Sequence, residues 1–220
     1  MLQKPLNPAQ AKKAKVIRGD SIVTPPLSEK PPKNIQGKVL IKVGDKISTD
    51  IIMPAGAFLK YRSNVPEYAK YVFNPCNESG KPTFAERAID LKKEGKHGLI
   101  VAGESYGQGS SREHAALCPM YLGVKAVLAK SIERIHTANL INFAMVPILF
   151  EDPADYEKID QNDEIQIPNL MPAIEKGDQT IEIKNISQNS SFYGRIVISS
   201  RQRKILISGG LLPMVKESRT

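Results

Sequence analysis

The chain has 220 residues, of which 41% are hydrophobic and 25% are charged, a composition that fits one well-buried globular domain. Its net charge of +8 is the sum of +6 for residues 1–40, −2 for residues 41–200 and +4 for residues 201–220, and such basic ends without interleaved aromatic residues do not predict a nucleic-acid site. No run of about 18 apolar residues could cross a membrane and the first residues lack the apolar centre of a secretory signal, so we expect a cytoplasmic protein.

The amino-terminal part is rich in proline and lysine. Residues 1–35 are predicted to form an extended linker arm, laid over a single domain that occupies residues 36–220. The first elements expected in that domain are a strand at KVLIKV, an extended piece at STDIIMPAG that leads to a turn, a short helix at NVPEYAKYVF capped by Asn64, and a helix at TFAERAIDLKKEG ended by Gly95.

The middle of the chain alternates between strand and helix patterns. The strands are HGLIVAG, KAVLA and VPILF; the helices are EHAALCPMYLG, closed by Gly123, and IERIHTANLINF. This alternation predicts an α/β fold with a mainly parallel sheet flanked by helices. After Asp152 the short segments DEIQI, QTIEIK and GRIVIS, followed by KILISGG, favour a small antiparallel β appendage that closes one end.

Cysteines and histidines do not form a recognisable metal motif. Cys76 and Cys118 are far apart, so they predict neither a disulfide framework nor a zinc or iron–sulfur site. His114 and His136 are separated by a helix and a strand and lack a third spaced ligand. We interpret His114 as capping its helix or supporting the site residues, and His136 as a packed or surface histidine.

The segment GESYGQGSSREHAAL, residues 103–117, lies at a corner between a predicted strand and a predicted helix. The first N–H groups of such a helix attract an anion, and the Arg112 guanidinium suits a carboxylate. The alternative is that Ser110 and Glu113 form only a capping box. Tyr106 and Gln108 either contact a substrate or pack the loop. The loop matches neither of the two common glycine-rich phosphate motifs, so a nucleotide site is not predicted.

Three segments together resemble one enzyme superfamily. They are GDKISTDIIMPAGAFLKYRSN at 44–64, GESYGQGSSREHAAL at 103–117 and AKSIERIHTANLINFAMVPILF at 129–150. They resemble the carboxy-terminal swivel domain of the aconitase and isopropylmalate dehydratase superfamily, over residues 36–170. One departure is Ile51, where aconitases usually have histidine and isopropylmalate dehydratase small subunits often have an aliphatic residue.

The resemblance implies roles for six residues. Ser110 matches the serine that acts as the catalytic base, and Asp50 matches an aspartate that helps to protonate the departing hydroxyl together with a histidine from another domain. The substrate-binding positions implied by the resemblance are Arg62, Ser111, Arg112 and Thr49. The expected enzyme is a hydro-lyase of the aconitate hydratase type, which interconverts citrate and isocitrate through cis-aconitate.

The superfamily uses a 4Fe–4S cluster held by three cysteines, which this chain does not have. The resemblance therefore implies a partner, either a cluster-bearing large subunit or amino-terminal aconitase domains, and a chain that is inactive alone. Its substrate would be a tricarboxylate or a hydroxy-dicarboxylate. The alternatives are the small subunit of 3-isopropylmalate or homoaconitate dehydratase, and a binding or regulatory module that has lost catalysis.

Overall fold

The structure, a computed structural model, describes residues 4–15 and 17–218. Residues 1–3 and 16 of the expected arm and residues 219–220 of the basic tail lie outside the described residues. The strands of the described part are β1 (Ile35–Val43), β2 (His97–Ala102), β3 (Val124–Ala129), β4 (Val146–Phe150), β5 (Glu164–Ile167), β6 (Thr180–Asn185) and β7 (Ser190–Arg195). The α-helices are α1 (Pro8–Lys13), α2 (Thr49–Ile52), α3 (Val65–Tyr68), α4 (Phe84–Lys93), α5 (His114–Tyr121), α6 (Arg134–Asn142), α7 (Leu170–Lys176), α8 (Ser200–Ile207) and α9 (Leu211–Glu217). Short 3-10 turns are η1 (Gly56–Tyr61), η2 (Ala69–Tyr71), η3 (Asn74–Cys76) and η4 (Pro153–Lys158).

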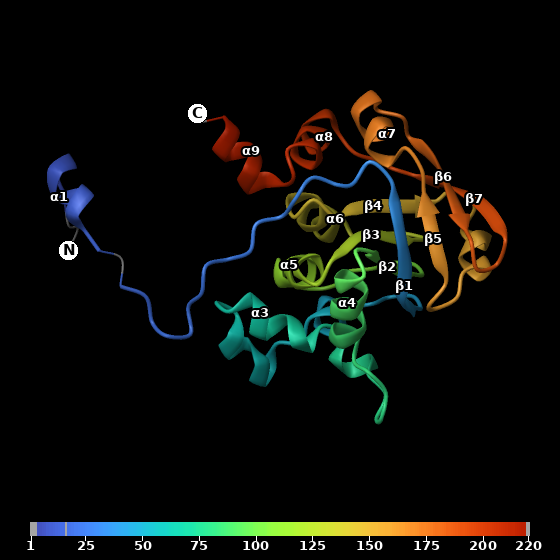
Figure 1. Cartoon of the computed structure of the whole chain (residues 1–220), viewed down its shortest axis with the longest axis horizontal. Coiled ribbons are helices and arrows are strands. Elements are labelled where there is room, and N and C mark those ends of the chain that lie inside the picture. The colour runs from blue at the N-terminus through green and yellow to red at the C-terminus, as the bar shows by residue number, and fades with distance from the viewer. Residues whose placement is uncertain (1–3, 16, 219–220) are drawn as a thin grey trace.

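The strands of the described residues close into one barrel, in the order β1-β2-β3-β4-β7-β6-β5 (Figure 1). Neighbours within β1–β4 pair in parallel, and every pair that includes β5, β6 or β7 is antiparallel. The prediction of a mainly parallel sheet with a small antiparallel appendage is therefore wrong, and only the mixed α/β content fits. The three later strands are part of the same sheet because β7 pairs with β4 and β5 pairs with β1.

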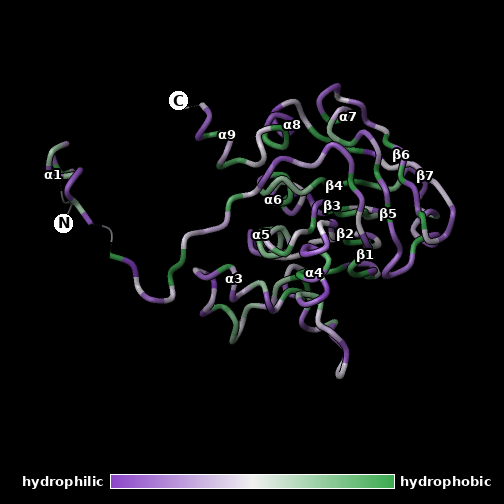
Figure 2. The backbone as a smooth tube through the Cα atoms, in the orientation of Figure 1, coloured by the Kyte–Doolittle hydropathy of each residue, from purple (hydrophilic) through white to green (hydrophobic). Residues whose placement is uncertain are grey.

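The burial pattern explains why the sequence did not distinguish these two architectures. Along β2, Leu99 and Val101 join a core that gathers side chains from all seven described strands, which is the interior of the barrel. Ile100 and Ala102, on the opposite face, join a second core beneath α3, α4 and α5. Both faces are thus apolar, as Figure 2 shows for β2–β4, and the same hydrophobic run suits a sheet between helices or a barrel wall.

Most local predictions in the middle of the chain are confirmed. The strands β1–β4 and the helices α3–α6 lie where the sequence predicts them. Asn64 caps α3, because its Oδ1 atom accepts a hydrogen bond from the Glu67 N–H at 3.2 Å. Gly95 and Gly123, which follow α4 and α5, have φ angles of +73° and +96°, the left-handed backbone that glycine favours after a helix.

Three local predictions are wrong, two of them for reasons of capping. STDIIMPAG begins with a helical turn and not an extended piece, because the Ser48 hydroxyl accepts the N–H of Ile51 at 3.3 Å. The last strand lies at Ser190–Arg195, ahead of most of GRIVIS. KILISGG lies in α8 and the turn after it, since Ser199 and Gln202 form a capping box that starts this helix.

The amino-terminal segment leaves the body of the molecule in Figure 1, with α1 at its far end. Residues 17–34 contact the domain at separate points: the Val23 N–H donates to the Ser63 carbonyl at 3.0 Å, and the Ser28 hydroxyl donates to the Gly209 carbonyl at 2.6 Å. The division of the chain at residue 35 stays a prediction. In the part of the chain that the structure describes, no helix has the length and apolar character needed to cross a membrane.

Candidate active site

The loop between β2 and α5 forms the centre of the site. Gly107 and Gly109 have φ angles of +85° and +94°, so the loop turns sharply at both. The N–H groups of Gly107 and Gln108 donate to the Ile47 carbonyl at 2.8 and 3.0 Å, and the Thr49 N–H donates to the Gln108 carbonyl at 2.8 Å. These bonds hold the serine loop against the start of α2, which comes from a distant part of the sequence.

The beginning of α5 does not use the capping box that the sequence allows. The helix starts at His114 with Glu113 at the N-cap position, and no side chain caps it. Within the described residues, the N–H groups of Ser111, Arg112 and His114 have no hydrogen-bond acceptor. Ser110 and Ser111 are exposed. The corner therefore presents free donors beside two accessible serine hydroxyls, an arrangement that favours an anionic group.

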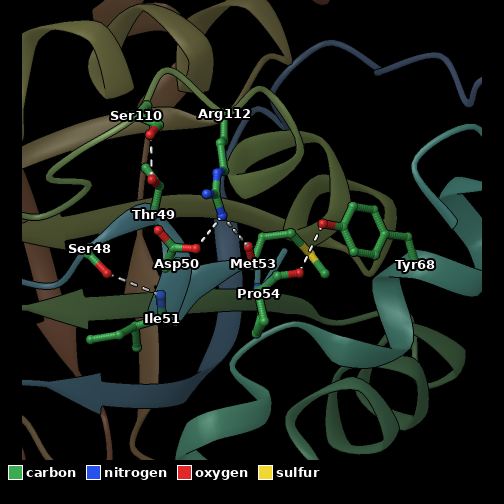
Figure 3. Close-up of polar contacts among 9 residues, drawn as sticks. All are labelled: Ser48, Thr49, Asp50, Ile51, Met53, Pro54, Tyr68, Ser110 and Arg112. Atoms are coloured by element: carbon green, nitrogen blue, oxygen red, sulfur yellow. Dashed lines mark hydrogen bonds and ion pairs between the residues drawn. The ribbon is translucent and has the colours of Figure 1, made fainter. Parts of the chain in front are cut away.

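Two side chains of α2 meet the serine loop (Figure 3). The Thr49 hydroxyl donates to the Ser110 carbonyl at 3.1 Å, and Thr49 is buried, with 1% of its surface exposed. Arg112 points at Asp50: its Nη1 atom donates to the Asp50 carboxylate and also lies 3.5 Å from the Met53 carbonyl oxygen. The structure thus brings together Thr49, Asp50, Ser110 and Arg112.

Arg62 directly follows η1, at its C-cap position. Its side chain is exposed, and among the described residues its guanidinium makes no hydrogen bond or ion pair. Its backbone carbonyl lies 2.9 Å from the Nε2 atom of His114, so the segment that carries Arg62 is joined to α5. Arg62 is therefore tied to the serine corner by its backbone, while its charge remains available.

A pocket of about 200 Å³ opens beside Ser110. Thr49, Gly107 and Gly109 line it on one side. On the other side it is lined by residues of α6 and the turn before it: Glu133, Arg134, Ile135, His136 and Asn139. Asp50, Arg62, Ser111 and Arg112 do not line it. The sequence analysis did not predict that α6 lines the site. The feature that could have indicated it is the pair of polar residues, His136 and Asn139, within the predicted helix.

Burial accounts for the state of two titratable groups. His136 has 1% of its surface exposed, and burial lowers the pKa of its imidazole to about 4, so the ring is neutral at pH 7. Cys118 is buried in α5, and burial raises the pKa of its thiol well above the ordinary value. Cys118 is therefore not a thiolate ligand in this fold.

The described residues do not fit an iron–sulfur cluster. They contain no group of three or more histidine, cysteine, aspartate or glutamate side chains that could hold a metal ion. Cys76 is exposed and Cys118 is buried, so the two thiols occur in different environments. A cluster associated with this chain would need ligands from elsewhere.

Comparison with known proteins agrees with this arrangement. Residues 58–153 match the aconitase C-terminal domain family, a range that includes Arg62 and Ser110–Arg112 but not Thr49 or Asp50. The chain is 39% identical over 172 residues to a probable mitochondrial aconitate hydratase of Dictyostelium discoideum, covering 70% of this chain and 22% of that protein. It is 33% identical over 210 residues to a putative mitochondrial aconitate hydratase of Emericella nidulans, covering 87% and 26%. It is also 34% identical over 160 residues to a mitochondrial homocitrate dehydratase of Saccharomyces cerevisiae, covering 66% and 20%.

Among solved structures, the 3-isopropylmalate dehydratase LeuD of Methanocaldococcus jannaschii superposes with a TM-score of 0.63 at 29% identity, covering 84% of this chain and 95% of that one. The barrel and its serine corner thus define a domain of the aconitase type. The chain belongs to the aconitase and isopropylmalate dehydratase superfamily. It spans about a quarter or less of the length of the curated aconitate hydratases it matches.

The expectation of a cytoplasmic protein is contradicted by the aconitate hydratases that the chain matches, which are named as mitochondrial enzymes.

Proposed function

We propose that this chain is the swivel domain or small subunit of an aconitate hydratase, a hydro-lyase that interconverts citrate and isocitrate through cis-aconitate. One observation carries the proposal: Thr49 contacts Ser110 and Asp50 contacts Arg112, although the partners are 61 and 62 positions apart in the sequence. A fold that brings a serine, an arginine and an acid to one exposed corner suits a carboxylic acid substrate. The similarity to aconitate hydratases favours citrate and isocitrate as the substrates.

In this proposal Ser110 is the base that removes a proton from carbon. A serine hydroxyl does this only if its surroundings stabilise the oxyanion. The free N–H groups of Ser111, Arg112 and His114 and the Arg112 charge lie at the same corner and would supply that stabilisation. Since Ser110 is exposed on this chain, it can face a substrate held by another polypeptide.

The remaining residues would bind the substrate and assist the leaving group. Arg62 and Arg112 would bind carboxylates, with Ser111 adding a hydroxyl. Arg112 contacts Asp50 through Nη1, which leaves other guanidinium N–H groups for a substrate. Asp50 would help to protonate the departing hydroxyl. Thr49 is buried and donates to the Ser110 carbonyl, so its part is to hold the serine loop next to bound substrate.

The proposal requires a second polypeptide or further domains. The 4Fe–4S cluster, the Lewis acid for the departing hydroxyl, is assigned to a cluster-bearing large subunit or to amino-terminal aconitase domains. The swivel domain would close over that partner when substrate is bound and exclude surrounding water. Residues 1–35 would serve as the linker. The chain alone is then expected to be inactive.

A second candidate is the small subunit of 3-isopropylmalate or homoaconitate dehydratase. The likeness to the 3-isopropylmalate dehydratase structure favours it, because this chain covers 95% of that protein but only 22% to 26% of the first two aconitate hydratases. The match to a homocitrate dehydratase and the aliphatic Ile51 support it as well.

The test is anaerobic hydration of cis-aconitate, isopropylmaleate and homoaconitate by this chain alone and then mixed with the cluster-bearing polypeptide of the same organism. Activity only in the mixture, and highest with cis-aconitate, is the expected result. Ser110→Ala should remove nearly all turnover while substrate still binds, whereas Ser191→Ala, an exposed serine on β7, should have no effect. Full turnover in Ser110→Ala would reject Ser110 as the base, and no turnover of any acid would favour a binding module.

A further inference from the structure

Two buried polar residues of α6 are among those that line the pocket beside Ser110. His136 and Asn139 are 1% and 7% exposed, and both line the pocket together with Ser110 and Thr49. They are three positions apart in a helix, which places them on the same face. The helix thus places two polar residues beside the serine loop, and the proposed function gives neither of them a role.

The His136 ring is held between two residues of the serine loop. A Cβ atom added to Gly107 would lie 2.3 Å from Cγ of His136 and 2.4 Å from Cδ2, so the loop backbone runs directly against the ring. On another side Tyr106 packs its ring edge-on, with 5.2 Å between the ring centroids. The imidazole therefore has little room to turn, and its nitrogen atoms keep their direction.

The polar atoms of this pair lack partners. Neither ring nitrogen of His136 nor the Nδ2 atom of Asn139 has a hydrogen-bond partner among the described residues. A buried polar group left unpaired costs on the order of 1 to 3 kcal/mol, and folded proteins usually satisfy such groups with ordered water. Since burial keeps His136 neutral, its ring offers one N–H donor and one lone pair, and Asn139 adds a donor.

The chemistry of the pocket selects water over a carboxylate. A carboxylate accepts hydrogen bonds only, so it would leave the lone pair of His136 unpaired, while water both donates and accepts. Glu133 and Arg134 also line the pocket, so one charge of each sign is present and neither sign of ligand is favoured overall. The volume of about 200 Å³ is ample, since a single water needs roughly 10 to 15 Å³ by the same measure.

We propose that this pocket holds ordered water bound by His136 and Asn139, and that through this water the two residues position Ser110 and its loop. The water site stands on the structure alone, and the positioning role rests on the proposed function. His136 and Asn139 would touch no substrate atom. They would hold in place the loop that carries the serine.

The first test is a crystal structure of the full chain at a resolution that shows ordered water. We expect density within hydrogen-bond distance of a His136 ring nitrogen and of Asn139 Nδ2, and its loss in His136→Phe together with a shift of the Ser110 loop. A dry pocket, or a loop that does not move, would overturn the proposal. This result needs no turnover, so an inactive wild-type enzyme would reject the proposed function without deciding the water site.

The second test is kinetic, in the enzyme assembled with its cluster-bearing partner. His136→Phe and Asn139→Leu should each lower kcat by at least about tenfold and leave KM within about twofold, since small displacements of a reacting group are costly. His136→Gln, which keeps a donor and an acceptor, should recover most of the loss. His97→Phe, a histidine at the start of β2, is the matched control. Unchanged kcat in both pocket variants, or no recovery by glutamine, would contradict the positioning role.

Discussion

The Nε2 atom of His114 lies 2.9 Å from the backbone carbonyl oxygen of Arg62, and this contact joins the helix that follows the serine corner to the turn that carries the free arginine. The His114 ring packs against Tyr68, with 5.3 Å between centroids, and the Tyr68 hydroxyl donates to the Pro54 carbonyl at 2.9 Å. The position of Arg62 relative to Ser110 thus depends on a short chain of contacts through His114.

Loss of this contact should weaken substrate binding more than chemistry. His114→Ala removes one hydrogen bond, typically about 0.5 to 1.5 kcal/mol, so we expect KM to rise by roughly two- to tenfold with kcat nearly unchanged. Steady-state kinetics of the assembled enzyme measure this, and His97→Ala serves as a control away from the site. A fall in kcat at constant KM would show that His114 acts on Ser110 and not on Arg62.

The Arg112–Asp50 ion pair should matter for activity and little for stability. The Asp50 side chain is 60% exposed, and exposed pairs contribute about 0 to 1 kcal/mol. We expect Arg112→Lys to change the free energy of unfolding in urea by less than about 1 kcal/mol. The same change should lower kcat/KM by at least about 100-fold, because lysine lacks the planar donor fork of arginine.

A comparable pair provides the control. The Nε atom of Arg195, at the end of β7, lies 3.4 Å from a carboxylate oxygen of Glu151. Arg195→Lys should leave both stability and turnover nearly unchanged. A large loss of stability in Arg112→Lys would mean that the pair holds the corner together, and its effect on activity would then be indirect.

Gly107 should tolerate no side chain. Its φ angle is +85°, and a Cβ atom added there would lie 2.3 Å from Cγ of His136. Gly109 has a similar φ angle of +94°, but the atom nearest to its added Cβ is Thr49 Oγ1, 3.8 Å away. Left-handed backbone costs alanine about 1 to 2 kcal/mol, and overpacking adds about 1 to 3 kcal/mol. Gly107→Ala should therefore destabilise the chain more than Gly109→Ala, as judged by urea unfolding.

Gly44→Ala is the matched control, because nothing lies within 4 Å of its added Cβ and its φ is not in the left-handed region. It should change stability by no more than about 0.5 kcal/mol. Equal effects of Gly107→Ala and Gly109→Ala would mean that the His136 ring moves aside readily, which would also weaken the argument that it positions the loop.

Local patterns in the sequence were sufficient for many elements but not for barrel closure. The turn glycines and the apolar runs of β2–β4 depend on nearby residues, so they could be predicted. Closure depends on β5 pairing with β1, between residues such as Ile165 and Gly37, and no local pattern encodes such a distant partner. The helical turn at Thr49–Ile52 was missed because one cap, Ser48, outweighs an apolar run that also suits a strand.

The candidate site was likewise predictable in part. The resemblance pointed to Asp50, Ser110 and Arg112, and the structure places them together. The resemblance could not reveal that Arg112 pairs with Asp50, or that α6 lines the pocket beside Ser110, since both depend on how distant segments pack. Their catalytic roles stay predictions.

Stability should depend on pH through His136. Its folded-state pKa of about 4 lies below the ordinary value of 6.5, so the unfolded chain binds a proton that the folded chain excludes. The stability from the neutral ring is fully present above pH 6.5 and is lost as the pH falls toward 4, by an amount on the order of 3 kcal/mol. Burial also lowers the pKa of His97, which adds to the loss in the same direction. Urea unfolding at pH 7, 5.5 and 4.5 should show a steeper decline for wild type than for His136→Gln, and parallel declines would mean that His136 does not stay neutral in the folded chain.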